Sequence, residues 1–155
     1  MMKMRRKERE KDAVFALEVL RDCEYATLAT VNGDGMPYCV PLSPVVIDNL
    51  IYFHCAVEGK KLDNIKNNNA VCISGVRYAK YSLERMTVEY ESAVASGTCE
   101  IVIDEAEKII VLKAICEKYA KGSAENFDAM IARSLAKVCV CRVEIGQITG
   151  KANIA

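Results

Sequence analysis

Short segments of β-strand character, separated by turn signals, are the feature that most restricts the fold of this chain. The segments rich in β-branched, aromatic and other apolar residues are residues 25–32, 36–47, 50–56, 70–75, 88–103 and 137–148. Most of them follow one another without room for a crossover helix, so the strands are expected to pair antiparallel. The chain therefore predicts a mostly β, α+β fold, an antiparallel barrel of about six or seven strands with flanking helices.

Helices are expected beside this barrel. Apolar residues recur at helical spacing in four segments, residues 12–22, 59–66, 104–121 and 125–135. Asp104 is expected to cap the third helix, with Glu107 at the reciprocal capping position. Residues 76–87 show no clear period and are expected to form a long connection. Gly97 interrupts the long segment 88–103, which predicts a bulge or bend there.

Three prolines fall in the second β segment, at Pro37, Pro41 and Pro44. Proline lacks the N–H that a central strand donates to its neighbour. This segment is therefore expected at a sheet edge, at a bulge, or facing something other than another strand. Backbone polar groups that remain free there would be available to a ligand.

A strand passes into a helix through a glycine turn at Gly59, and Lys60 and Lys61 stand where that helix begins. Free N–H groups at a helix N-terminus favour an anion, and two lysines add full positive charge, so the turn predicts a phosphate-sized site. His54, the single histidine, lies a few residues before this turn. Histidine side chains ordinarily titrate near neutral pH, so His54 is a candidate proton donor. The alternative interpretation, without a binding site, is a solvent-exposed helix start with surface lysines and a histidine that packs in the core.

Composition restricts the partners and the compartment. Lysine plus arginine and aspartate plus glutamate number 21 each, so no overall field attracts nucleic acid or an acidic membrane. No apolar run approaches a membrane span, and the charged N-terminal stretch is followed by no signal-peptide core. We expect a cytoplasmic protein with reduced thiols, folded as a single domain over residues 1–155.

The eight cysteines lack the spacing of a metal site. Only Cys139 and Cys141 are close, as Cys-x-Cys, and His54 is the single histidine available to help them. Positions two apart share one face of a strand, where thiols pack as small hydrophobes. We therefore expect no metal ligands.

Five sequence blocks occur in a characteristic order, namely LATV from Leu28, GMPYCVPL from Gly35, YFHCAVEGKKLDNI from Tyr52, YESAVASG from Tyr90 and ITGKA from Ile148. In this order the chain resembles the pyridoxamine 5′-phosphate oxidase-like FMN-binding proteins, and among them it is most similar to the nitroimidazole-resistance (Nim) branch. The resemblance extends from about Arg5 to Ala152. It implies a split β-barrel that acts as a homodimer, with FMN in two symmetric sites at the subunit interface.

The resemblance also implies roles for individual residues. The strand whose backbone lies along the flavin ring corresponds to Tyr38, Cys39, Val40, Pro41 and Leu42. The turn that holds the FMN phosphate corresponds to Gly59, Lys60 and Lys61. Polar groups contributed by the second subunit correspond to Tyr90 and Ser92, and His54 matches a histidine beside the flavin.

The function implied is an FMN-dependent oxidoreductase that reduces small electron-poor molecules, with nitroaromatic or nitroimidazole-like compounds as one class. Because the chain has no dinucleotide fingerprint, its electrons are expected from a transient donor such as reduced nicotinamide. The pyridoxamine-phosphate oxidases proper carry a C-terminal segment with tryptophan and arginine contacts to their substrate, whereas this chain has no tryptophan and ends at Ala155, so pyridoxamine phosphate is not expected as the substrate. A separate departure from the family pattern is Glu91, which alters the charge beside Ser92.

Two alternatives to this function stay open. One is a flavin carrier or sensor that does not turn over a substrate. The other is a haem-binding split barrel, in which His54 is the sole possible histidine ligand and cysteine or tyrosine could also serve. The paired lysines at the turn argue for a phosphate-bearing ligand ahead of haem.

Overall fold

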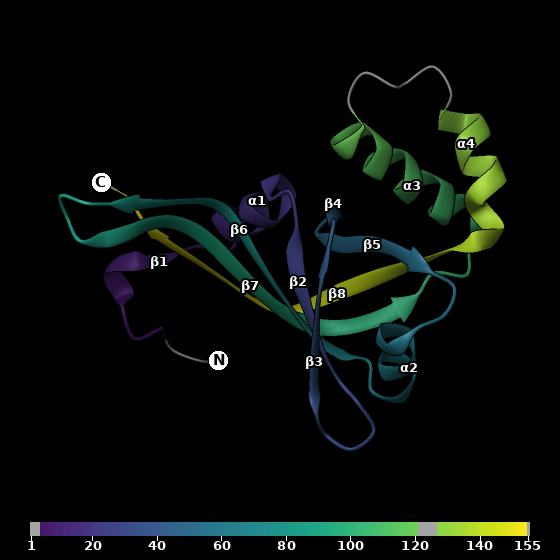
Figure 1. Ribbon diagram of the computed structural model, residues 1–155, viewed down its shortest axis with the longest axis horizontal. Helices are drawn as coiled ribbons and strands as arrows, with labels where there is room; N and C mark the ends of the chain where they lie inside the picture. Colours follow the sequence, from purple (N-terminus) through teal and green to yellow (C-terminus); the bar gives the residue numbers. More distant parts are fainter. Residues whose placement is uncertain (1–3, 121–126, 155) are drawn as a thin grey trace.

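One open antiparallel sheet organises the molecule (Figure 1). The computed structural model describes residues 4–120 and 127–154. Its strands are β1 (Glu10–Lys11), β2 (Ala26–Val31), β3 (Pro37–Leu42), β4 (Val45–Ile47), β5 (Leu50–Ala56), β6 (Ala70–Ser82), β7 (Thr87–Ile101) and β8 (Val138–Asn153). They follow the order β3-β2-β6-β7-β8-β5-β4, and the short β1 pairs with β8. The path does not close on itself, which confirms the predicted mostly β, split-barrel fold.

Helices flank this sheet. They are α1 (Ala13–Asp22), α2 (Lys60–Asn67), α3 (Glu105–Tyr119) and α4 (Phe127–Ser134), with short 3-10 turns η1 (Lys7–Arg9) and η3 (Leu135–Lys137). All four predicted helices are present, although residue 121 and residues 125–126 of the predicted ranges lie outside the described residues. Within the described chain, no helix combines the length and apolar character needed to cross a membrane.

The N-terminus of α3 forms only half of the predicted capping pair. The Asp104 carboxylate accepts a hydrogen bond from the Glu107 amide at 3.1 Å, as expected. The Glu107 carboxylate instead accepts from the Tyr52 hydroxyl at 2.9 Å and from Arg142 at 3.0 Å. These tertiary bonds tie the start of α3 to β5 and β8.

Apolar side chains form two clusters on opposite faces of β5. The cluster inside the barrel contains Phe53 together with Leu28 of β2, both fully buried. The other cluster lies beneath α3 and α4 and contains Tyr52 and Val111. Because side chains alternate along a strand, His54 lies on the face of Tyr52, toward α3 and α4.

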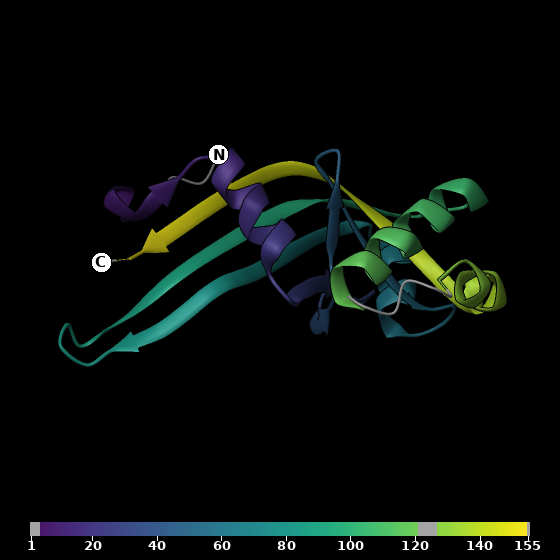
Figure 2. The same ribbon diagram turned by 90° about the horizontal axis from the view of Figure 1, so that it is seen from above.

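The prediction of a long connection at residues 76–87 is wrong. β6 continues to Ser82 and β7 begins at Thr87, so only residues 83–86 connect them. Both views of the ribbon show this hairpin as an arm that extends away from α2 and α3 (Figures 1 and 2). Its side chains are largely exposed in the single chain, and its register shifts between Val76 and Tyr78, so the sequence lacks the alternation typical of a half-buried strand.

The predicted irregularity at Gly97 is confirmed. The pairing of β7 with β8 shifts register between Ser96 and Gly97. A Cβ atom on Gly97 would collide with the backbone carbonyl of Glu144, so a side chain is excluded there. The irregularity lets one long strand serve both the barrel and the arm.

Candidate functional site

The start of α2 has the features of an anion site. Gly59 is the N-cap residue, its φ is +133°, and no side chain caps the helix. A Cβ built on Gly59 would meet nothing within 4 Å, so the space over the turn is open. Neither Lys60 nor Lys61 forms an ion pair with another described residue. Open space, an uncapped helix start and two uncommitted ammonium groups fit a phosphate.

The strand β3 supplies a free sheet edge. It lies at one end of the sheet order and, within the described residues, pairs only with β2. Pro37 and Pro41 both lie on it, so of the three locations expected for these prolines the structure shows the sheet edge, and Pro44 lies between β3 and β4. Alternate residues Tyr38, Val40 and Leu42 are half-buried, whereas the residues between them are exposed. The free N–H and C=O groups of such an edge suit a planar ring with polar margins.

A buried chain of hydrogen bonds joins α2 to β3. The Asn64 side-chain amide donates to the Thr30 hydroxyl at 2.9 Å, and that hydroxyl donates to the Tyr38 carbonyl at 3.4 Å. Asn64 is 1% exposed and Thr30 is 2% exposed. Buried polar groups persist in a core when they are paired, and here the pairing fixes the helix that begins at Lys60 against the edge strand. The candidate phosphate turn and the candidate ring strand are thus held together.

We expect Asn64→Ala to lower both stability and flavin affinity. The substitution leaves the buried Thr30 hydroxyl without its donor, which costs about 1–3 kcal/mol in free energy of unfolding. Chemical denaturation measures the loss of stability. FMN titration measures the loss of affinity that follows when the turn at Gly59 is no longer fixed against β3. Asn67→Ala, at an exposed position of the same helix, is the matched control and should leave both quantities unchanged. Equal results for the two variants would contradict a positioning role for Asn64.

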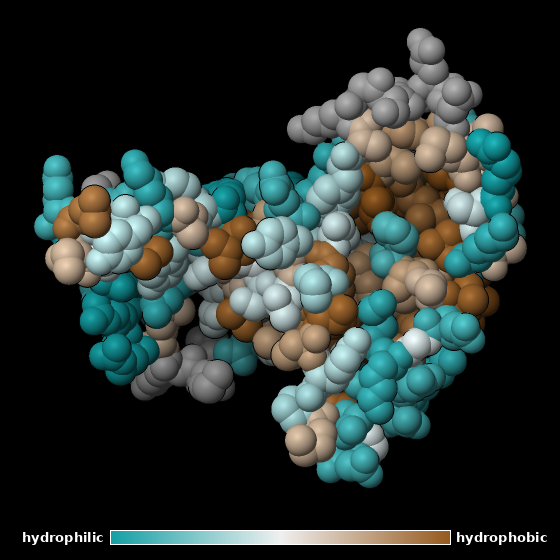
Figure 3. All heavy atoms as spheres, in the orientation of Figure 1, coloured by the Kyte–Doolittle hydropathy of each residue, from teal (hydrophilic) through white to brown (hydrophobic). Residues whose placement is uncertain are grey.

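His54 lies in the wall of an apolar pocket. The pocket has a volume of about 320 Å³ and is formed mainly by α3, α4 and the start of β8. Besides His54, its lining includes Leu112, Ile115, Met130, Ile131 and Val138. The surface view shows a hollow bordered by hydrophobic residues next to α3 and α4 (Figure 3). Arg133 and Ser134 also line the pocket, so a few polar side chains in a mostly apolar wall could orient a small apolar or aromatic ligand.

The charge state of His54 follows from its surroundings. Partial burial against the pocket wall, and then the positive charge of Lys61, lower the pKa of His54 below its ordinary value of 6.5. The imidazole is therefore neutral at pH 7, and it can both donate and accept a hydrogen bond. His54 lies near the C-terminal end of β5, and residues 57–59 connect that end to α2, so His54 and the candidate phosphate turn share one neighbourhood of the fold.

Tyr90 and Ser92 do not join this neighbourhood within one chain. They lie near the start of β7, on the arm, and both views place the hairpin end of the arm opposite α2 (Figures 1 and 2). Ser92 donates a hydrogen bond to the Lys151 carbonyl at 3.4 Å. Burial alone would raise the pKa of Tyr90, but hydrogen bonds with Arg9 and Lys151 lower it overall. Arg9 of η1 and Lys151 of β8 therefore form a second, basic group of residues beside Tyr90.

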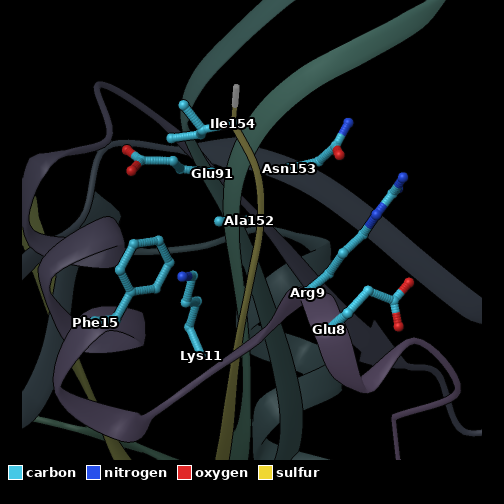
Figure 4. A pocket seen from close by; sticks show the side chains of 8 residues that line it. All are labelled: Glu8, Arg9, Lys11, Phe15, Glu91, Ala152, Asn153 and Ile154. Carbon is cyan, nitrogen blue, oxygen red and sulfur yellow. The ribbon is translucent and has the colours of Figure 1, made fainter.

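A pocket of about 360 Å³ adjoins this basic group (Figure 4). Figure 4 shows Phe15 and Lys11 on one side of β8 at Ala152, and Arg9 on the other. Glu91 also lines the pocket, and its carboxylate accepts a hydrogen bond from Arg77 Nε at 2.7 Å. The ion pair with Arg77 offsets the negative charge of Glu91, the residue before Ser92 at which this chain departs from the family pattern.

Sequence reasoning missed several of these residues. Asn64 resembles any polar residue of a surface helix and lies off the face that Leu62 and Ile65 form, so the helical pattern does not predict its burial. Arg9 and Lys151 flank Tyr90 only because β1 pairs with β8 and β8 with β7. No local pattern marks such a pairing.

Comparisons with known proteins bear on the family and the fold of the chain. The profile of the pyridoxamine 5′-phosphate oxidase family matches residues 12–152. A solved structure of a candidate 5-nitroimidazole antibiotic resistance protein from Bacteroides thetaiotaomicron is 26% identical, with 91% of this chain and 84% of that chain covered and a TM-score of 0.76. No protein with a curated description matches the chain.

Two more distant structures share the fold. A flavocytochrome from Azotobacter vinelandii is 16% identical, with 99% of this chain and 73% of that chain covered and a TM-score of 0.83. An FAD and haem binding protein from Mycobacterium smegmatis is 19% identical, with 95% and 74% covered and a TM-score of 0.77. At these identities the likeness supports the fold alone.

Proposed function

The chain belongs to the pyridoxamine 5′-phosphate oxidase family, and from that premise we propose that it is an FMN-dependent oxidoreductase for small electron-poor substrates. The observation that carries the proposal is the open, uncapped turn at Gly59, with its two uncommitted lysines, fixed against the free edge of β3. One phosphorylated, planar ligand accounts for both features. A bound flavin supplies the electron transfer that no amino-acid side chain can perform.

In this proposal the residues of the chain divide the work of holding the cofactor. The amides that follow Gly59 and the ammonium groups of Lys60 and Lys61 bind the phosphate. The β3 backbone, from Tyr38 through Cys39, Val40 and Pro41 to Leu42, lies along the ring. The neutral His54 orients the substrate or, when protonated, donates a proton to the reduced product.

We further propose that each site is completed by a second copy of the chain. Tyr90 and Ser92 lie in the first half of β7, and the hairpin that begins this strand lies at the opposite end of the molecule from α2 (Figure 1). The arm also exposes apolar side chains that a partner would cover, with Leu83 76% and Met86 75% exposed. In a symmetric dimer the basic group around Tyr90 would favour an anionic ligand held by the partner.

Mixed dimers test this division of the site. One chain carries Lys60→Ala and Lys61→Ala, and the other carries Tyr90→Phe and Ser92→Ala. If the arm acts across the interface, each mixed dimer contains one site built only from unaltered residues, and FMN binding returns to about half the wild-type stoichiometry. If all the residues act within one chain, every site keeps a defect and no binding returns.

The rate at which a substrate reoxidises the reduced flavin distinguishes a catalyst from a flavin carrier. The flavin-loaded protein is reduced without oxygen and then given a nitroaromatic compound or a nitroimidazole. We expect rapid reoxidation with stoichiometric loss of the nitro compound. Electrons that persist until oxygen or a protein acceptor is added would instead indicate a carrier or sensor. Reduced nicotinamide, tested as the donor under the same conditions, is expected to support repeated turnover.

A further inference from the structure

Three cysteines that are scattered in the sequence meet in the fold. Cys55 of β5 lies directly opposite Cys139 of β8, and Phe53 lies opposite Cys141, so the three cysteines occupy one face of the paired strands. The three sulfur atoms lie within 4.8 Å of one another. Spacing within the chain shows only Cys-x-Cys, because the third member depends on the register of β5 against β8.

The cluster packs within the core of the barrel. Cys139 and Cys141 are buried among its apolar residues, and Cys55 is half-buried and packs against them. Hydrogen bonding with Cys141 and burial raise the pKa of Cys55, and burial raises the pKa of Cys139. The free thiols are therefore neutral, and the cluster carries no unpaired charge in the core.

We propose that Cys55, Cys139 and Cys141 form a binding site for one soft metal ion, with Cu(I) as the preferred ion. Thiolate sulfur selects soft ions, Cu(I) among them. Structural zinc is almost always bound by four protein ligands, and the described residues place three ligands in this group. His54 adjoins Cys55 in sequence, and the alternation of the strand directs it to the other face.

A fourth thiol adjoins the cluster without belonging to it. Cys99 of β7 belongs to the same buried apolar cluster as Cys141, but it is not among the cysteines whose sulfurs lie within 4.8 Å of one another. Its participation would complete a four-sulfur, zinc-type site. The choice between three and four sulfurs therefore decides the ion, and the experiment is built to separate them.

The test is transfer of Cu(I) from a chromogenic chelator to the purified full-length protein under anaerobic, reducing conditions. We expect one equivalent of Cu(I) to be withdrawn, and X-ray absorption of the loaded protein should show three sulfur neighbours. Loss of an outer-shell partner alone lowers metal affinity about 10–100-fold, so Cys55→Ala, Cys139→Ala and Cys141→Ala should each lower it at least that far. Zn(II) should bind more weakly than Cu(I).

Control variants show whether a loss of Cu(I) affinity comes from the cluster or from misfolding. Cys39→Ala and Cys116→Ala alter cysteines outside the cluster, and Cys99→Ala alters the adjoining thiol; all three should retain Cu(I) affinity. Circular dichroism identifies any variant that does not fold, and the X-ray absorption result on the wild type does not depend on variants. No transfer of Cu(I) to the wild type, or tighter Zn(II) binding with four sulfur neighbours, would overturn the proposal.

Discussion

Replacing Lys60 and Lys61 together with alanine should weaken FMN binding by more than about tenfold, since each charge-assisted contact to a phosphate contributes about 1.5–3 kcal/mol. The two ammonium groups are uncommitted to other described residues, so their removal leaves the rest of the fold unchanged. Fluorescence titration of flavin into the purified protein measures the effect.

Two controls isolate the phosphate contact. Lys66→Ala removes a lysine from the last turn of the same helix, where the dipole disfavours an anion, and should not affect FMN affinity. Riboflavin, which lacks the phosphate, should bind the double variant as well as it binds the wild type. Unchanged FMN affinity, or an equal loss for riboflavin, would remove the phosphate assignment.

Replacing His54 with alanine should slow turnover about a hundredfold while FMN affinity is preserved, as expected for loss of a positioned proton donor. His54 has a lowered pKa, so its protonated form accumulates only below pH 6.5. If that form donates the proton, turnover of the wild type falls as the pH rises through the pKa of His54. Stopped-flow reoxidation by a nitroaromatic compound, recorded as a function of pH, measures both effects.

His54→Gln separates proton transfer from shape. Glutamine retains a hydrogen-bonding side chain but does not titrate, so the pH-dependent limb should disappear while part of the orienting contact survives. Turnover that is unaffected in both variants would make His54 a packing residue of the pocket wall.

The parts of the fold and site that could be predicted rest on local backbone chemistry. The sequence Gly-Lys-Lys predicts the turn at Gly59, and prolines that cannot donate in a central strand restrict the second β segment to an edge, a bulge or a face without a neighbouring strand. The structure adds the positive φ of Gly59 and places Pro37 and Pro41 at an edge. Gly97 is a similar case, because the backbone of Glu144 on the neighbouring strand β8 leaves no room for a side chain.

The rest depends on contacts between distant segments. The arm of β6 and β7 exposes both of its faces in a single chain. Apolar and polar residues therefore do not alternate along residues 76–82, and the sequence does not predict a strand there. Asn64 is buried only because its helix packs on β2. The meeting of Cys55 with Cys139 and Cys141 depends on one strand register, which a shift of a single residue would abolish.

The most direct test of the central proposal is a visible absorption spectrum of the protein purified without added cofactor, repeated after FMN is added and the excess removed. A bound-flavin spectrum with one FMN per chain is the predicted result. A protein that stays colourless after exposure to FMN would contradict the proposal, and a Soret band would replace it with a haem protein.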